Sequence, residues 1–111
     1  MKKINIIKES REFTRIIKNN KPFKYMDFLV YKEKKDNDIY KFGFSVGKKI
    51  GNAVMRNKVK RRLKNIIDQY KFKDNFNCVI IVKKGIAEKS YQEMSKEVDF
   101  IIDKLGLAKE K

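Results

Sequence analysis

The residues of this sequence that are best suited to chemistry form one run of bases without an acid. Residues 48–64 carry eight Lys or Arg side chains and no Asp or Glu. Like charges follow one another at helical spacing, as in Arg56, Lys60 and Lys64, and such pairs destabilise an isolated helix. A solvated helix face normally mixes both signs. Because phosphate groups would offset the repulsion, the run predicts a phosphate-binding surface.

The charge of the whole chain points to the same class of partner. Its 111 residues include 29 Lys or Arg against 14 Asp or Glu, which leaves a formal net charge of +15. Nucleic acid is the expected partner of such a chain, and an anionic membrane surface is the alternative. No apolar run approaches the ~20 residues of a membrane span, so we predict no membrane partner. At this length we expect one domain, residues 1–111, with a frayed tail at 107–111.

The residue types do not favour catalysis by the protein itself. The chain has no histidine, the side chain best suited to proton transfer near neutral pH. A metal-dependent nuclease would need clustered carboxylates. The acids are instead scattered, because Asp27, Asp36 and Asp38 lie in or near expected turns, and Asp99 and Asp103 share a helix face far along the chain. We therefore predict no catalytic residue, no metal site and no cofactor in the protein alone.

Hydrophobic periodicity and turn residues predict an α+β domain with the element order α-β-β-α-β-α. Ser10 is expected to cap the first helix, and Pro22 to follow its end. A capping box of Ser90 and Glu93 opens the last helix, and Gly106 closes it. The other expected elements are strands at 23–32 and 39–47 joined by a polar turn at 33–38, a helix at 53–70 and a strand at 78–83. One further short strand is compatible with this pattern.

The apolar residues of these elements define the expected core. In the second helix, Val59, Leu63 and Ile66 recur at spacings that form a core-facing stripe. The run 78–82 is apolar throughout and predicts a central strand of a mixed sheet, buried on both faces by packed helices. Cys78 is the only cysteine and cannot form an internal disulfide, which favours a cytosolic protein.

The basic run also carries a family signature. The stretch from Lys48 to Arg61 reads KKIGNAVMRNKVKR. It resembles the signature of the bacterial ribonuclease P protein family, whose core is an Arg-Asn-Arg-like tripeptide followed by a Lys-Arg pair. The resemblance extends over most of the chain in the order and spacing of the other elements. Two positions depart from the family pattern. Lys58 is the third residue of the tripeptide, which weakens only bidentate phosphate contacts, and Ile17 stands where many members have an aromatic residue.

What this resemblance implies is specific. Members of the family join a catalytic RNA to form the endoribonuclease (EC 3.1.26.5) that removes the 5′ leader of precursor tRNA. The catalytic site is then expected in the RNA, with Mg²⁺ in the RNA-containing holoenzyme. The expected partners are the catalytic RNA and precursor tRNA, with no DNA, and the expected location is the bacterial cytoplasm. The family fold also implies a left-handed βαβ crossover, against the general right-handed rule.

The resemblance assigns roles to two groups of residues. The expected surface for the catalytic RNA comprises Lys48, Lys49, Asn52, Arg56, Asn57, Lys58, Lys60, Arg61, Arg62 and Lys64. The expected cleft for the single-stranded leader lies between the first helix and the sheet and comprises Phe13, Ile17, Phe28 and Tyr31. Single strands bind where aromatic faces lie in a positive groove. From the residues alone, each aromatic is more often a core residue, and a self-sufficient metal nuclease or a small ribosomal protein stay open as alternatives.

Overall fold

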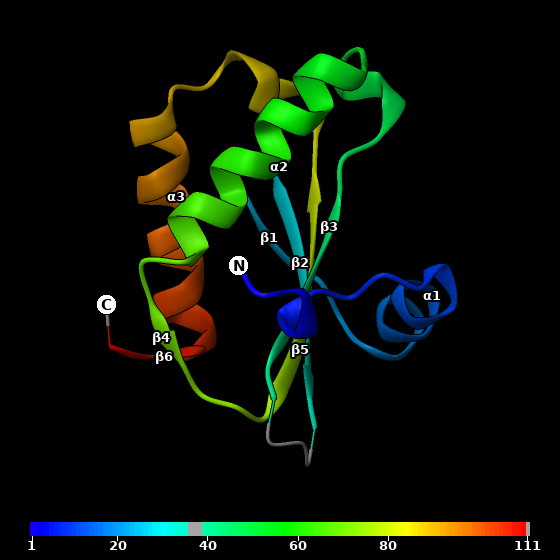
Figure 1. Cartoon of the computed structure of the whole chain (residues 1–111), viewed down its shortest axis with the longest axis vertical. Helices are drawn as coiled ribbons and strands as arrows, with labels where there is room; N and C mark the ends of the chain where they lie inside the picture. Colours follow the sequence, from blue (N-terminus) through cyan, green and yellow to red (C-terminus); the bar gives the residue numbers. More distant parts are fainter. Residues whose placement is uncertain (36–38, 111) are drawn as a thin grey trace.

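The computed structural model describes residues 1–35 and 39–110, and Figure 1 shows its layers. The longer elements are α1 (Ser10–Asn19), β1 (Phe23–Tyr25), β2 (Phe28–Lys34), β3 (Lys41–Ser45), α2 (Ala53–Ile67), β5 (Phe76–Val82) and α3 (Tyr91–Leu105). The short elements are the strands β4 (Lys71–Phe72) and β6 (Ala108–Glu110) and the 3₁₀ turns η1 (Lys3–Asn5), η2 (Lys48–Ile50) and η3 (Lys84–Glu88). The α+β class and the expected order of the main elements are confirmed.

The main sheet is mixed, and its strand order is β1-β2-β5-β3. The apolar strand β5 is central, because it pairs antiparallel with β2 and parallel with β3. Helix α1 covers one face of the sheet, and α2 and α3 cover the other (Figure 1). A strand between two helical layers has no face in water, which explains why β5 is apolar at nearly every position. The prediction of a central, doubly buried strand is confirmed.

The segment from β3 through α2 to β5 forms a βαβ unit whose two strands are direct neighbours. In Figure 1 the chain leaves the end of β3, returns along α2 over one face of the sheet and re-enters beside β3. Both parallel strands therefore end at the same edge of the sheet, and the loops that follow them meet there. The left-handed sense of this crossover stays a prediction of the family resemblance.

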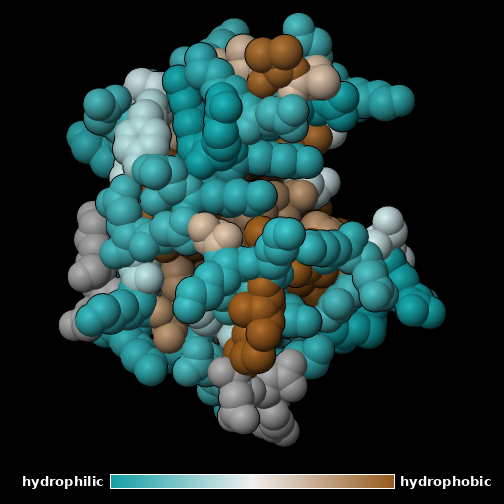
Figure 2. All heavy atoms as spheres, viewed as in Figure 1, coloured by the Kyte–Doolittle hydropathy of each residue, from teal (hydrophilic) through white to brown (hydrophobic). Residues whose placement is uncertain are grey.

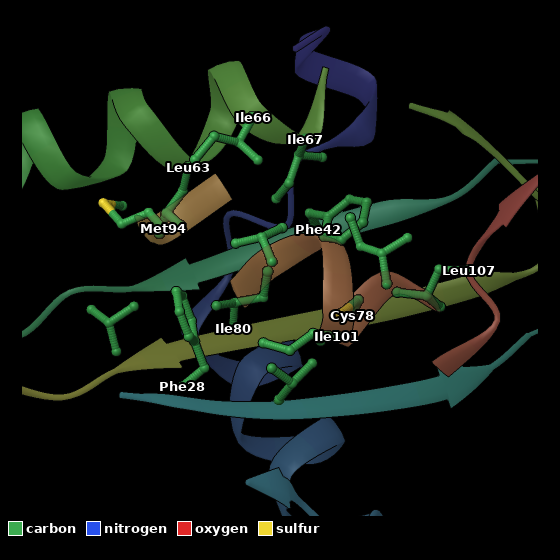
Figure 3. Packing of buried hydrophobic residues seen from close by; sticks show 14 of the residues in the cluster. Phe28, Phe42, Leu63, Ile66, Ile67, Cys78, Ile80, Met94, Ile101 and Leu107 are labelled. Carbon is green, nitrogen blue, oxygen red and sulfur yellow. The ribbon is translucent and has the colours of Figure 1, made fainter. Parts of the chain in front are cut away.

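Two apolar clusters lie on the two faces of the sheet. The larger one fills the layer between the sheet and α2 and α3, and it includes Phe28, Phe42 and Leu63 (Figure 3). The smaller one lies under α1 and includes Ile16 and Tyr31. The predicted stripe of α2 is confirmed, since its core-facing residues Val59, Leu63 and Ile66 are at most 2% exposed.

The predicted strand at 23–32 is two strands, so this prediction is wrong in detail. β1 and β2 pair antiparallel, with Tyr25 opposite Phe28, and the chain reverses at Met26 and Asp27. Met26 has a φ of 50°, the left-handed conformation that tight hairpin turns require. The sequence did not indicate this turn, because neither Met26 nor Asp27 is a glycine or proline and the flanking residues are apolar. The main sheet thus has one strand more than the three predicted, as the prediction allowed, whereas the small second sheet of β4 and β6 was not predicted.

The predicted frayed tail is also wrong for residues 107–110, and residue 111 lies outside the described residues. Leu107 is 1% exposed and belongs to the larger cluster, and its carbonyl accepts a hydrogen bond from the N–H of Lys73 at 3.0 Å. The next residues form β6, which pairs antiparallel with β4. Burial of one large aliphatic side chain contributes about 1.5–3 kcal/mol, enough to order a short terminal segment.

The helix ends follow the expected chemistry with one exception. The capping box of Ser90 and Glu93 is present at the start of α3, and Gly106 ends that helix with a φ of 63°. At α1 the N-cap position is Glu9 rather than Ser10, and no side chain caps this helix. The predicted turn at 33–38 is shortened, because β2 continues to Lys34, and residues 36–38 lie outside the described residues. In the described part of the chain, none of the helices combines the length and apolarity that crossing a membrane requires.

Candidate nucleic-acid interface

Helix α2 presents the basic run on the surface. The side chain of Asn52 accepts a hydrogen bond from the N–H of Met55 at 2.9 Å and thereby starts the helix. Because the apolar stripe faces the sheet, the polar residues must occupy the rest of the circumference. Figure 2 shows hydrophilic residues over the face of α2 that is turned to the viewer. The exposed members of the expected RNA surface are Lys48, Lys49, Asn52, Asn57, Lys58 and Arg61, and the half-buried members are Arg56, Lys60, Arg62 and Lys64.

The positive charge of this surface is not neutralised within the described residues. Ion pairs form elsewhere, for example between Arg15 and Glu33 or between Lys89 and Asp27. None of the described ion pairs involves a base from residues 48–64. The repulsion expected from the sequence is therefore present in the folded chain, and a polyanion would relieve it.

Arg62 differs from the other bases of α2. Its Nη1 donates a hydrogen bond to the carbonyl of Lys89 at 3.3 Å, and so links α2 to the start of α3. Lys89 itself lies between two carboxylates, Asp27 at 2.9 Å and Glu97. Part of the guanidinium of Arg62 thus has a structural role, which the spacing of charges along the sequence did not indicate.

A second pair of lysines joins the surface at the edge of the sheet. Lys83 and Lys84 follow β5, as Lys48 and Lys49 follow β3. Both pairs border one hollow of about 630 Å³, whose floor includes Ile81. Lys83 and Lys84 were not among the site residues predicted from the sequence. The signal was available, because the loops after adjacent parallel strands meet at one edge, and the βαβ unit was predicted.

A separate shallow groove of about 340 Å³ lies between α1 and β3, the strand at the open edge of the main sheet. Figure 2 shows the corresponding recess beside α1, with apolar atoms inside it. Phe13 and Ile17, two of the four residues expected in the leader cleft, line this groove. Its full lining is Lys8, Ser10, Phe13, Thr14, Ile17, Phe44 and Ser45.

The structure does not bring the other two expected cleft residues into the groove. Phe28 is fully buried on the opposite face of the sheet, among the residues under α2 and α3, so its expected place in the leader cleft is corrected. Tyr31 does lie on the α1 side, but it is only 8% exposed and packs with Ile16 and Val79. The two residues are three positions apart on one strand, and side chains an odd number apart point to opposite faces.

A polar cluster holds α1 in place beside the groove. The guanidinium of Arg15 contacts both carboxylate oxygens of Glu33, at 2.5 and 3.0 Å. Asn77, which is fully buried on β5, donates to the same carboxylate at 3.1 Å. The hydrogen bonds from Arg15 hold the pKa of Glu33 below its ordinary value, and the bond from Asn77 adds to this effect. These three residues, Arg15, Glu33 and Asn77, are called the clamp below. The clamp connects α1 to both β2 and β5 and thereby holds Phe13 in position relative to the sheet.

The remaining candidates for reactive or metal-binding groups are the Cys78 thiol and the carboxylates. Burial raises the pKa of the Cys78 thiol to about 12, so this sulfur is protonated and unreactive at neutral pH. Among residues 1–35 and 39–110, no group of three or more Asp, Glu or Cys side chains is arranged to hold a metal ion.

Comparisons with known proteins identify the family. The model of the family described as Ribonuclease P matches residues 1–106. The chain is 37% identical to the ribonuclease P protein component of Mycoplasma mycoides, over 95% of this chain and 99% of that protein. Its fold is similar to the RNase P proteins of Staphylococcus aureus (TM-score 0.81, 25% identity, 91% and 94% of the two chains) and Thermotoga maritima (TM-score 0.80, 25% identity, 88% and 94%). A match over nearly the whole chain by both sequence and fold means that this chain belongs to the ribonuclease P protein family.

Proposed function

We propose that the chain is the protein subunit of a bacterial ribonuclease P, which binds a catalytic RNA and the 5′ leader of precursor tRNA in the cytoplasm. The observation that carries this proposal is the charge of α2 and η2, which no described ion pair compensates, beside a groove that Phe13 lines. A duplex or folded RNA offers the dense phosphates that such a surface needs, and an unpaired leader offers base faces to the groove.

The positions of the two surfaces support separate roles for them in binding the catalytic RNA and the leader. The basic face of α2 and the Lys48–Lys49 turn form one continuous surface, which suits the large RNA partner. The groove between α1 and β3 lies next to that surface, because Ser45 lines both the groove and the lysine hollow. An RNA bound on α2 would therefore place its substrate near the groove. In this proposal Phe13 and Ile17 contact the leader, and Tyr31 supports α1 from below.

The bond cleavage is assigned to the RNA. The protein has no histidine, and its one thiol is buried and protonated. Mg²⁺, if bound by the RNA and its substrate, would supply Lewis-acid chemistry for phosphodiester hydrolysis. The protein contributes binding energy for the precursor and offsets repulsion between the RNAs, and it requires no cofactor of its own.

Reconstitution tests the proposal. Purified protein, the catalytic RNA of the same organism and its precursor tRNA are combined at low magnesium. We expect leader removal only when both protein and RNA are present, with tighter binding of precursor than of mature tRNA. Cleavage by nuclease-treated protein without RNA would instead identify a self-sufficient nuclease. The absence of any effect of the protein on RNA-catalysed cleavage would contradict the proposal.

A further inference from the structure

Lys89 lies in a group of paired charges between the end of η3 and the start of α3. Its Nζ contacts the carboxylate of Asp27 at 2.9 Å and also that of Glu97. The side chains of Lys89 and Glu97 are only 14% and 13% exposed, and that of Asp27 is 27% exposed. Charges with so little contact to water are stable only as a paired set. These three residues are called the Lys89 cluster below.

The Lys89 cluster connects segments that are distant in the sequence. Asp27 belongs to the turn between β1 and β2, and Glu97 belongs to α3. The carbonyl of Asp27 also accepts a hydrogen bond from the N–H of Lys83 at 2.8 Å. A Cβ atom at position 85 would be 2.7 Å from Oδ1 of Asp27, so the η3 turn lies directly against this carboxylate. The main chain at 83–89 is therefore held in place by contacts at both of its ends.

The carbonyl of Lys89 is the acceptor for a base of the RNA-facing helix. Nη1 of Arg62 donates a hydrogen bond to it at 3.3 Å. The Arg62 side chain makes no other hydrogen bond or ion pair among the described residues, so Nε and Nη2 are available to a ligand. A free arginine side chain loses much rotamer freedom when it binds. For Arg62 part of this ordering is already present in the free protein.

We infer that Lys89 is a positioning residue for RNA binding, because the Lys89 cluster fixes the carbonyl that orients the guanidinium of Arg62 toward a phosphate of the catalytic RNA. The inference rests on the proposed function, since it concerns the same basic surface of α2. Lys89 and Glu97 do not touch the RNA themselves, because their charged ends are engaged with each other below the surface.

Orientation matters for Arg62 more than for the lysines of α2. A guanidinium is planar and its donors point in fixed directions, so it binds a phosphate through two hydrogen bonds only when its plane is correctly placed. A lysine is a point charge on a flexible stem and needs no such support. Arg61 is the natural comparison, because it is the neighbouring guanidinium on α2 and is exposed.

A change at Glu97 separates positioning from a general effect of charge, because the two predict opposite signs. Glu97→Gln removes one negative charge from a chain of net charge +15, and added positive charge favours RNA binding. Loss of the ion pair instead loosens Lys89 and its carbonyl, so positioning predicts weaker binding. Asp103→Asn is the matched control, since it makes the same change in charge at an exposed residue of α3 outside the Lys89 cluster.

The test measures the dissociation constant between the purified protein and the catalytic RNA of the same organism at one salt concentration. We expect Arg62→Ala to weaken binding roughly tenfold, as the loss of one charge-assisted hydrogen bond implies. Glu97→Gln should cause part of this loss, roughly threefold or more, and Asp103→Asn should not weaken binding. A Glu97→Gln protein that binds the RNA as tightly as the wild type would overturn the inference.

A double-mutant cycle shows whether the effect of Glu97 passes through Arg62. In the Arg62→Ala background, Glu97→Gln should have no further effect, because the guanidinium that it positions is gone. In the Arg61→Ala background, Glu97→Gln should keep its full effect. An equal loss in the two backgrounds would mean that Glu97 only stabilises the fold, and would overturn the inference.

Two further results keep the inference separate from folding and from the proposed function. If the wild-type protein does not bind the catalytic RNA, the proposed function itself fails. If the wild type binds and Arg62→Ala binds equally well, only the role of Lys89 fails. Should Glu97→Gln not fold, ¹⁵N relaxation of the arginine side chains in the free wild-type protein decides. A more ordered Nε–H group in Arg62 than in Arg61 supports the inference, and equal order overturns it.

Discussion

The ring of Phe13 on α1 lies directly over Gly43 on β3. A Cβ atom at position 43 would be 2.6 Å from Cζ of Phe13 and 3.2 Å from Cβ of Ile7. The gap that glycine leaves in this face of the sheet is thus filled by a side chain from the first helix. Because Gly43 has no side chain, α1 can lie close to the sheet. This close approach also sets the width of the groove.

Gly43→Ala should therefore displace Phe13 and destabilise the chain. Extra methyl groups in a packed site cost about 1–3 kcal/mol, and urea unfolding measures this loss. In Phe13→Leu the clash is relieved, so Gly43→Ala should cost less in that background. Equal costs in the two backgrounds of this double-mutant cycle would show that the two residues are not in contact.

Tyr31→Ala should act on stability rather than on the choice of RNA. The ring is buried between α1 and the sheet, and removal of a large buried aromatic side chain costs about 3–5 kcal/mol. Tyr31→Phe, which removes only the hydroxyl group, is the control and should unfold near the wild type. Precursor and leaderless tRNA should lose affinity by the same factor in the alanine variant. A selective loss of precursor binding in a folded Tyr31→Ala protein would return Tyr31 to the leader site.

Binding to the catalytic RNA should depend steeply on salt, because each neutralised phosphate releases counterions. If half of the bases at 48–64 contact phosphates, affinity should fall by orders of magnitude between about 50 and 200 mM salt. Arg61→Ala should flatten the logarithmic salt slope by about one unit or less. Lys109→Ala, an exposed lysine on β6, is the matched control and should keep the wild-type slope. An unchanged slope in Arg61→Ala would place Arg61 outside the RNA contact.

The clamp of Arg15 and Glu33 should make stability fall in acid. The pKa of Glu33 is lowered by folding, so its contribution is present above the ordinary pKa of glutamate and is lost as the pH falls through the folded-state value. Urea unfolding between neutral pH and about pH 3 measures this decrease in the free energy of unfolding. The decrease should be smaller in Glu33→Gln. It should be unchanged in Glu88→Gln, which alters an exposed residue of η3. If Glu33→Gln loses as much stability in acid as the wild type, the clamp does not contribute to the pH dependence of stability.

Several features of the chain were determined by local sequence. The stripe of α2, the capping box at Ser90 and the apolar run of β5 each lie within one element, so spacing along the chain was sufficient to predict them. The basic signature from Lys48 to Arg61 is equally local, and it indicated both the phosphate-binding surface and the family.

Tertiary structure alone decided what depends on contacts between distant segments. Side chains alternate between the two faces along β2, so Phe28 and Tyr31 lie on opposite faces of the sheet. Only the packing of α1 decides which of the two residues lies beneath that helix. Leu107 is ordered because it docks into a core built from other elements. Ser45 lines the groove because β3 lies at the edge of the sheet, and strand order is a property of the assembled sheet that periodicity along a single strand does not contain.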